Sequence, residues 1–174
     1  MKKTLFICIT LISLFSVKAQ LRLEGQLGGA NFWGYTTNIE GLKPLNKAHT
    51  HNLGIKLGVG ALLPGWASEP TVIIHSGLNY YFKNWGVGGE VSGFAINPFA
   101  NTYYGATPDL SMLVYPNASY TFKLKKSNYL KVSAGVFLAY ERYYSEFNAS
   151  KMEFAGDPIP GISICFGSEF FEKE

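Results

Sequence analysis

The sequence predicts an all-β protein, and three observations support that fold class. Only 16% of the 174 residues are charged, whereas an ordinary soluble domain has about 25%. Nineteen glycines, eleven tyrosines and thirteen phenylalanines favour strands over helical bundles. Apolar residues also recur at every second position over long stretches, which is the period of a strand. The length fits one domain.

The N-terminal residues have the pattern of a secretory signal peptide. Lys2-Lys3 precedes an apolar run from Leu5 to Phe15, and Val17-Lys18-Ala19 places small residues before a cut. We therefore expect residues 1–19 to be a cleaved signal peptide and residues 20–174 to form the mature β-barrel domain.

Cleavage changes the charge and the cysteine content. Three lysines and no acid leave with the signal peptide, so the mature chain has twelve basic and twelve acidic residues. A net charge of zero gives no support for a surface that binds polyanions, and we expect no nucleic-acid partner. Cys165 is then the one remaining cysteine, which we interpret as a small packing residue that forms no disulfide.

Six segments show the alternation of a strand. They are Leu21 to Phe32, Asn52 to Leu63, Thr71 to Lys83, Leu110 to Lys125, Tyr129 to Tyr144 and Ile159 to Phe171. In the second segment every odd position from Leu53 to Leu63 is apolar, and the positions between are polar or glycine. These segments are longer than a typical strand of a soluble protein, which has roughly five or six residues. They match the roughly 9 to 11 residues with which a tilted strand crosses a bilayer.

The two faces of these segments differ in charge. The apolar faces carry hardly any charge. Aromatic residues, Tyr81 and Tyr129 among them, gather near the strand ends, as in the girdles of a membrane barrel. The charged residues fall on the other face, where we predict a polar network inside the barrel; its members are Arg22, Glu24, Lys56, Lys131, Glu141 and Glu169. An ion path is the alternative interpretation of these six residues.

The connections predict how the strands are joined. Residues 64–70 and 125–128 form short turns, whereas residues 34–51, 84–109 and 145–158 form long loops. Short and long connections in alternation are typical of an up-and-down antiparallel transmembrane β-barrel with both chain ends on the periplasmic side.

Six strands are fewer than the eight or so of the smallest such barrels. Residues 85–105 contain enough alternation for two more short strands, which would close an eight-stranded barrel. The alternative is a truncated barrel that lacks a final hairpin.

Several strand patterns are similar to those of one family. Gly28 to Phe32 ends the first strand, Tyr115-Pro116 and Ala134 to Phe137 lie in later strands, and Gly161 to Gly167 lies in the last one. In these patterns the chain resembles the PorT-like (porin-like) outer-membrane β-barrel proteins of Gram-negative bacteria. The resemblance implies an eight-stranded outer-membrane barrel and transfers no site residues. Members of the family usually continue with another hairpin after the strand that corresponds to Gly161 to Gly167.

Residues with catalytic or ligand-binding chemistry are sparse. His49 and His51 could share a metal in an extended segment, but solvated loop histidines explain them as well. Gly86 to Gly89 lacks the lysine and the hydroxyl residue of a phosphate-binding loop. We therefore expect no enzymatic activity, no cofactor and no metal site.

These observations predict a small outer-membrane β-barrel with a structural or surface-interaction role, surrounded by outer-membrane lipid. The aromatic loops around Phe32 to Tyr35, Phe94 to Tyr104 and Tyr143 to Phe154 would contact a protein partner. A bore of eight strands is too narrow for a general pore. The alternative is a soluble periplasmic β-barrel or sandwich that binds an apolar small ligand. The direction in which Leu57 and its neighbours face distinguishes the two.

Overall fold

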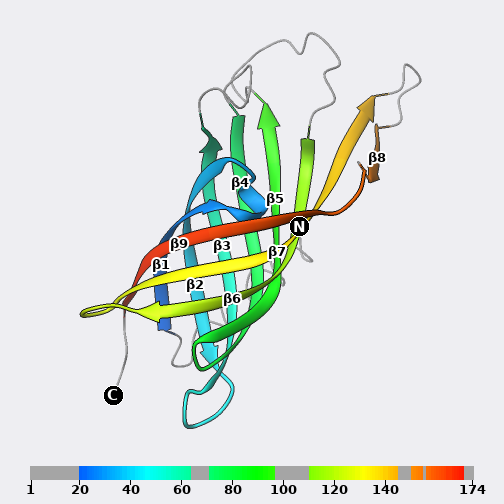
Figure 1. Ribbon diagram of the computed structural model, residues 1–174. Coiled ribbons are helices and arrows are strands. Elements are labelled where there is room, and N and C mark those ends of the chain that lie inside the picture. The colour runs from blue at the N-terminus through cyan, green and yellow to red at the C-terminus, as the bar shows by residue number, and fades with distance from the viewer. Residues whose placement is uncertain (1–19, 64–70, 97–109, 145–149, 155, 171–174) are drawn as a thin grey trace, which may run out of the picture.

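The computed structural model describes residues 20–63, 71–96, 110–144, 150–154 and 156–170 of the chain (Figure 1). In these residues the strands are β1 (Gln20–Gly28), β2 (Gly34–Pro44), β3 (His51–Leu62), β4 (Thr71–Phe82), β5 (Trp85–Ile96), β6 (Leu110–Lys123), β7 (Asn128–Tyr144), β8 (Ser150–Phe154) and β9 (Ile159–Phe170). A short 3-10 turn, η1 (Gly29–Asn31), follows β1. Over the same residues, no helix has the length and apolar character needed to span a bilayer.

The strands form a closed antiparallel barrel. The sheet runs in the order β6-β5-β4-β3-β2-β1-β9-β7, and β6 pairs with β7 to close the ring. Within the described residues this ring has eight strands, because β8 pairs only with the part of β7 that lies beyond the last β7–β9 pair, Phe137↔Ile159. The predicted eight-stranded up-and-down barrel is therefore confirmed as the fold.

Within the described residues, each of the three predicted long loops contains a strand: β2 lies in 34–51, β5 in 84–109 and β8 in 145–158. Most of the predicted loop 34–51 is strand β2, in which Ile39 pairs with Leu23 of β1 on one side and with Leu57 of β3 on the other. The segment from which two strands were expected supplies, within the described residues, the single strand β5. Closure through β9, which pairs with both β1 and β7, requires no additional hairpin.

The two ends of the barrel differ. At one end, here called the terminus end, β1 begins and β9 ends, with Leu21 opposite Phe170. Residues 45–50, 83–84 and 124–127 join strands at this end. At the opposite end, here called the loop end, β3 leads to β4, β5 to β6, and β7 to β8 and β9. The short connection 64–70, which we expected on the same side as 125–128, therefore joins strands at the loop end.

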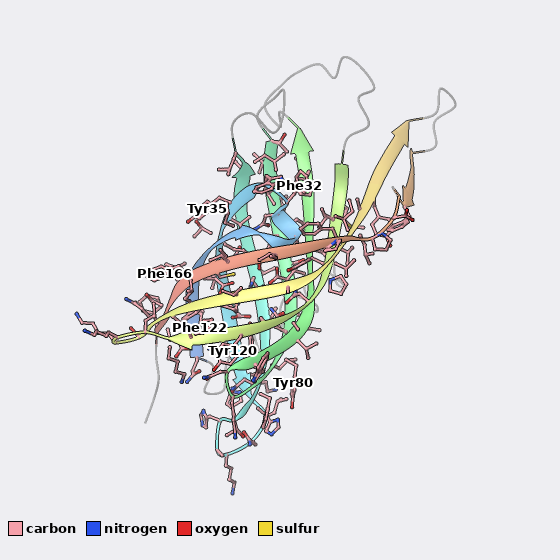
Figure 2. All side chains as sticks on the ribbon, in the orientation of Figure 1. Phe32, Tyr35, Tyr80, Tyr120, Phe122 and Phe166 are labelled. Atoms are coloured by element: carbon pink, nitrogen blue, oxygen red, sulfur yellow. The ribbon has the colours of Figure 1, made fainter. Side chains whose placement is uncertain are left out.

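The alternation of faces is confirmed. Leu57, Ile74 and Ile162 point outward with 61%, 64% and 66% of their surface exposed, whereas Lys56 points inward with none. Tyr80, Tyr120 and Phe122 lie toward the terminus end, while Phe32 and Tyr35 lie toward the loop end (Figure 2). Tyr81 and Tyr129, which the sequence placed with the outer aromatic residues, are buried and point into the barrel.

The turn between β1 and β2 folds into the barrel. Gly28 and Gly29 have φ angles of 75° and 62°, a left-handed conformation that glycine adopts without strain. Ala30 is fully buried against Leu113 and Tyr115, and the partly buried Phe32, Phe94 and Phe137 pack around this cluster. The apolar core therefore lies inside the barrel toward the loop end, next to η1.

Candidate functional site

The most distinctive group of side chains is a charged network inside the barrel. Its charged members come from six strands: Arg22 and Glu24 (β1), Glu40 (β2), Lys56 (β3), Glu90 (β5), Lys131 (β7) and Glu169 (β9). All of these except Glu169 are at most 8% exposed. At these levels the inward faces of the contributing strands hold mainly polar residues and glycine, with Leu42 and Cys165 among the exceptions, which is the inverse of a soluble core.

Glu24 lies at the centre of the network. Its Oε1 is 2.6 Å from Nζ of Lys56, and its Oε2 is 2.9 Å from Nζ of Lys131. The hydroxyl of Tyr129 donates to the same Oε2 at 2.8 Å. Glu24 thus connects β1 with β3 on one side and with β7 on the other, so strands far apart in the sequence are held by one carboxylate.

Lys56 extends the network to β5. Its Nζ lies 2.7 Å from Oε1 of Glu90 and donates to Oε1 of Gln26 at 3.0 Å. Gln26 in turn donates from Nε2 to Oε2 of Glu90 at 2.7 Å and accepts a bond from Asn38 at 3.1 Å. Lys56, Glu90 and Gln26 therefore each have a charged or amide partner, as buried charges require, whereas the buried Oδ1 of Asn38 has no hydrogen-bond partner among the described residues.

Arg22 organises the part of the network near the terminus end. Its guanidinium donates to Oε1 of Glu169 at 2.5 and 3.0 Å, and to Oε2 of Glu40 at 3.5 Å. The ring centroids of Tyr81 and Tyr129 lie 5.3 and 4.9 Å from the guanidinium carbon, within cation–π range. Glu40 also accepts from the Tyr81 hydroxyl at 2.6 Å. Because Nζ of Lys131 lies 3.7 Å from Oε2 of Glu40 and donates to the Tyr81 hydroxyl at 3.3 Å, this group is continuous with the central one.

Neutral polar residues continue the network to the inward turn. His75 lies with Nε2 3.9 Å from Oε2 of Glu90 and with Nδ1 2.9 Å from Oγ of Ser92. Ser92 donates to Oδ1 of Asn31 at 3.0 Å, and Nδ2 of Asn31 donates to Thr36 at 2.8 Å. Asn31 is fully buried, so these two bonds hold η1 inside the barrel.

The structure brings together five of the six residues that the sequence placed inside the barrel. Arg22, Glu24, Lys56, Lys131 and Glu169 are joined by the contacts above. The backbone of Glu141 pairs with β8, beyond the last residue pair of β7 and β9, and its place in the network stays a prediction. Its side chain lies outside the described residues.

Two carboxylates and two tyrosines are among the network members that the sequence reasoning missed. Glu40 fell in a predicted loop, and Tyr81 and Tyr129 were assigned to the outer girdle. For Glu90 a signal was present, since it alternates with Val87, Gly89 and Val91 in a segment whose assignment as a strand was left open. A stricter use of the two-residue period would have found this carboxylate.

The charges of the network are arranged in opposite pairs across the bore. In the described residues the buried cations Arg22, Lys56 and Lys131 face the buried anions Glu24, Glu40 and Glu90, so charge is compensated across the bore. Their side chains fill the space that a solute would have to cross.

The three histidines lie apart from one another. His51 lies with Nδ1 2.5 Å from the hydroxyl of Tyr80, His49 is exposed in the turn between β2 and β3, and His75 is buried in the bore. Across the described residues, no group of three or more histidine, cysteine or acidic side chains has a geometry that could hold a metal ion.

Comparisons with known proteins give distant structural likeness. No protein-family model matches the chain, and no curated protein sequence matches it significantly. A major outer membrane protein of Thermus thermophilus aligns with a TM-score of 0.45 at 10% identity, over 87% of this chain and 99% of that one. The Yersinia pestis outer membrane protein Ail, solved in a phospholipid bilayer nanodisc, aligns with a TM-score of 0.44 at 9% identity and the same coverage. Similarity at this level establishes neither a shared function nor a shared ancestry, and the likeness to the PorT-like family stays a prediction.

Proposed function

We propose that this chain is an outer-membrane β-barrel protein with a closed bore, and that its loop end serves as a contact surface outside the cell. The observation that carries the proposal is the inverted polarity of the barrel. Apolar side chains such as Leu57, Ile74 and Ile162 point outward, while the buried charges point inward. In water this arrangement would expose a wide apolar surface, whereas in a bilayer it buries that surface in lipid.

The height of the apolar surface supports the same placement. Along β3 and the residue that follows it, the outward residues run from Leu53 to Leu63 without a charge. Ten residue steps cover roughly 34 Å along a strand, and a tilt of about 45° reduces this to about 24 Å along the barrel axis. The apolar band of an outer-membrane barrel is about 25 Å tall.

The face polarity opposes the alternative of a soluble ligand-binding protein. Such a protein would line its interior with apolar residues and expose polar ones. Here Leu57 and Val59 are 61% and 59% exposed, and the interior at the same levels holds Lys56, Glu24 and Glu90. The small apolar core around Ala30 and Tyr115 is filled by η1 and by aromatic rings.

The contact surface differs in part from the sequence-based expectation. Phe32 and Phe94 pack against the buried cluster inside the barrel, so they support the fold rather than a partner. Tyr35 is 47% exposed beside the loop end. Farther out, β8 extends the sheet beyond the ring on β7, and Phe154 of β8 is 47% exposed and packs edge-on against Tyr140. We assign the contact role to this β7–β8 extension and its neighbours.

The remaining sequence-based expectations fit this proposal. The interior charges are paired with one another rather than arranged around an open substrate site, which supports a protein without enzymatic activity. The PorT-like resemblance implies the same eight-stranded fold. An external protein partner would reach the extension, while lipid surrounds the barrel wall.

Sided cysteine labelling tests the placement and the orientation together. Asp157→Cys, near the loop end, and Ser127→Cys, in the turn between β6 and β7, are both exposed sites, and the native Cys165 is buried. With a thiol reagent that does not cross membranes, we expect Asp157→Cys to react on intact cells and Ser127→Cys to react only after the outer membrane is permeabilised. Both proteins should fractionate with the outer membrane and migrate faster on a gel when unboiled.

Each other result has a defined meaning. Labelling of Ser127→Cys on intact cells, with Asp157→Cys protected, would reverse the orientation and remove the loop end as the external surface. Recovery of both variants in the soluble periplasmic fraction would refute the membrane placement.

The filled bore predicts that the protein does not conduct. Because Lys56, Glu24 and Lys131 contact one another across the barrel, an ion would have to break buried pairs to pass. In planar bilayers we expect no steady conductance steps from the purified protein at a concentration at which a porin control gives them. Reproducible steps of constant size would contradict the closed bore.

A further inference from the structure

A group of exposed lysines surrounds the terminus end of the barrel. Within the described residues it consists of Lys43, Lys47, Lys83, Lys123, Lys125 and Lys126, and all six side chains are exposed. They lie at the ends of β2 and β6 and in the turns that join β2 to β3, β4 to β5 and β6 to β7. We call this group the lysine rim.

Acidic side chains do not balance the lysine rim. Among the acids whose side chains are described, Glu24, Glu40 and Glu90 are buried in the bore and Glu169 pairs with Arg22. Asp157 is exposed, but it precedes β9 at the loop end. The sequence after β9 adds two acids and one lysine in residues 172–174, which leaves the lysines in excess. A mature chain of zero net charge therefore still has a strongly basic end.

Aromatic side chains lie directly beside the lysine rim. The rings of Trp85 and Tyr120 meet edge-on at 4.9 Å, and those of Tyr120 and Phe122 at 4.8 Å, on the outer face of β5 and β6. Nζ of Lys83 lies 5.3 Å from the ring centroid of Phe82. In Figure 2, Tyr80, Tyr120 and Phe122 lie toward this end of the barrel, and Phe166 lies between them and the loop end.

The order of these groups along the barrel matches one half of a bilayer. Apolar side chains meet hydrocarbon, aromatic rings favour the interfacial zone, and lysines reach the headgroups with their ammonium groups while their methylene chains stay on apolar surface. At the terminus end, the lysine rim would thus lie at the level of the lipid phosphates.

We propose that the lysine rim binds the headgroups of anionic phospholipids in the leaflet at the terminus end. This inference rests on the proposed membrane placement. Basic residues next to a membrane surface attract acidic lipids within about one Debye length, roughly 10 Å at 0.1 M salt. At this end the lysines outnumber the described acids, and aromatic rings adjoin them. This combination favours a lipid surface over a dissolved anion as the partner of the rim.

Trp85 provides a reporter for the test. It is 61% exposed and follows Lys83 by two residues, so it lies at the level of the lipid that the rim would bind. The mature chain with Trp33→Phe and Trp66→Phe leaves Trp85 as the one tryptophan. This protein is reconstituted in phosphatidylcholine vesicles that contain a minor fraction of lipid brominated near the headgroup, either phosphatidylglycerol or phosphatidylcholine. Bromine quenches tryptophan fluorescence on contact.

The expected result is stronger quenching of Trp85 by brominated phosphatidylglycerol than by brominated phosphatidylcholine at the same fraction. The enrichment should be about fivefold for each lysine engaged at low ionic strength, and it should fall at about 0.5 M salt. Replacing the four nearest rim lysines with glutamine, in K83Q/K123Q/K125Q/K126Q, should bring the ratio to one. The matching lysine-to-arginine variant should keep the preference.

A second reporter provides the control. A chain in which Trp33 is the one tryptophan, with Trp66→Phe and Trp85→Phe, reports on the loop end. We expect no preference for phosphatidylglycerol there. Two results would show that the lysine rim is not a lipid site: equal quenching of Trp85 by both lipids, or an equal preference for phosphatidylglycerol at Trp33 and Trp85. An acidic protein partner would then be the remaining explanation of the basic charge. A chain that neither brominated lipid quenches would instead overturn the membrane placement itself.

Discussion

Replacement of Lys56 by methionine should lower the free energy of unfolding by about 3–5 kcal/mol, which is the cost of leaving a buried opposite charge without its partner. Lys56 has no exposed surface and lies 2.6 Å from Glu24 and 2.7 Å from Glu90. In the variant, Glu24 keeps Lys131, but Glu90 loses its one ion-pair partner among the described lysines and arginines. Urea unfolding in lipid vesicles, followed by tryptophan fluorescence, measures the change.

A second variant separates lost charge pairing from lost packing. In Lys56→Met with Glu90→Gln, the stranded carboxylate is neutral and Gln26 still has an amide partner, so at least half of the lost stability should return. Lys47→Met, at an exposed turn position, should change stability by no more than about 0.5 kcal/mol. If Lys56→Met lowered the free energy of unfolding no more than Lys47→Met does, the prediction would be wrong, because water would then have to screen the charges in the bore.

Replacement of Leu57 by arginine should cost about 2–4 kcal/mol, because an outward arginine at mid-bilayer depth faces hydrocarbon. Leu57 is 61% exposed, and it stands midway along the uncharged outer face of β3. In water the same substitution would add a charge to an exposed position and would be nearly neutral. The variant thus distinguishes a lipid-facing strand from a solvent-facing one.

The matched control for this substitution is Leu45→Arg. Leu45 is also an exposed leucine, at 54%, but it lies in the turn between β2 and β3 at the terminus end. Near the interface the cost should be about 0–1 kcal/mol. Equal losses in the two variants, measured by urea unfolding in vesicles, would contradict a depth-dependent lipid environment.

The barrel could be predicted from the sequence because most strands keep a strict two-residue period. On β3, leucine, isoleucine and valine alternate with lysine, asparagine and glycine, so pattern and structure agree. Strand β2 does not show this contrast. Its outward positions include Thr37 and Lys43, and its inward positions include Asn38 and Glu40, so both faces look polar. Pairing with β1 and β3 on both edges holds it in place, and that information is not local.

The charged network could also be predicted only in part, because its contacts depend on long-range pairing. The period identified Arg22, Glu24, Lys56, Lys131 and Glu169 as residues of one face, but it contains no information on which of them meet. Contacts such as Arg22 with Glu169 join residues 147 positions apart, and they depend on ring closure and register. Tyr81 and Tyr129 share the two-residue period of the inward residues Asn79 and Lys131, so the period would have placed them inside the barrel. Their position at strand ends led instead to their assignment to the outer girdle.

The charge pairs across the bore also constrain how the barrel assembles. Arg22 and Glu24 of the first strand find Glu169 and Lys131 on strands near the end of the chain. In an open sheet Arg22 would have only Glu40 and Glu24 only Lys56, and entry into the membrane would bring these incompletely paired charges into hydrocarbon. Membrane entry and ring closure should therefore form a single concerted event, with the N-terminal strand held in water until the C-terminal strands are made.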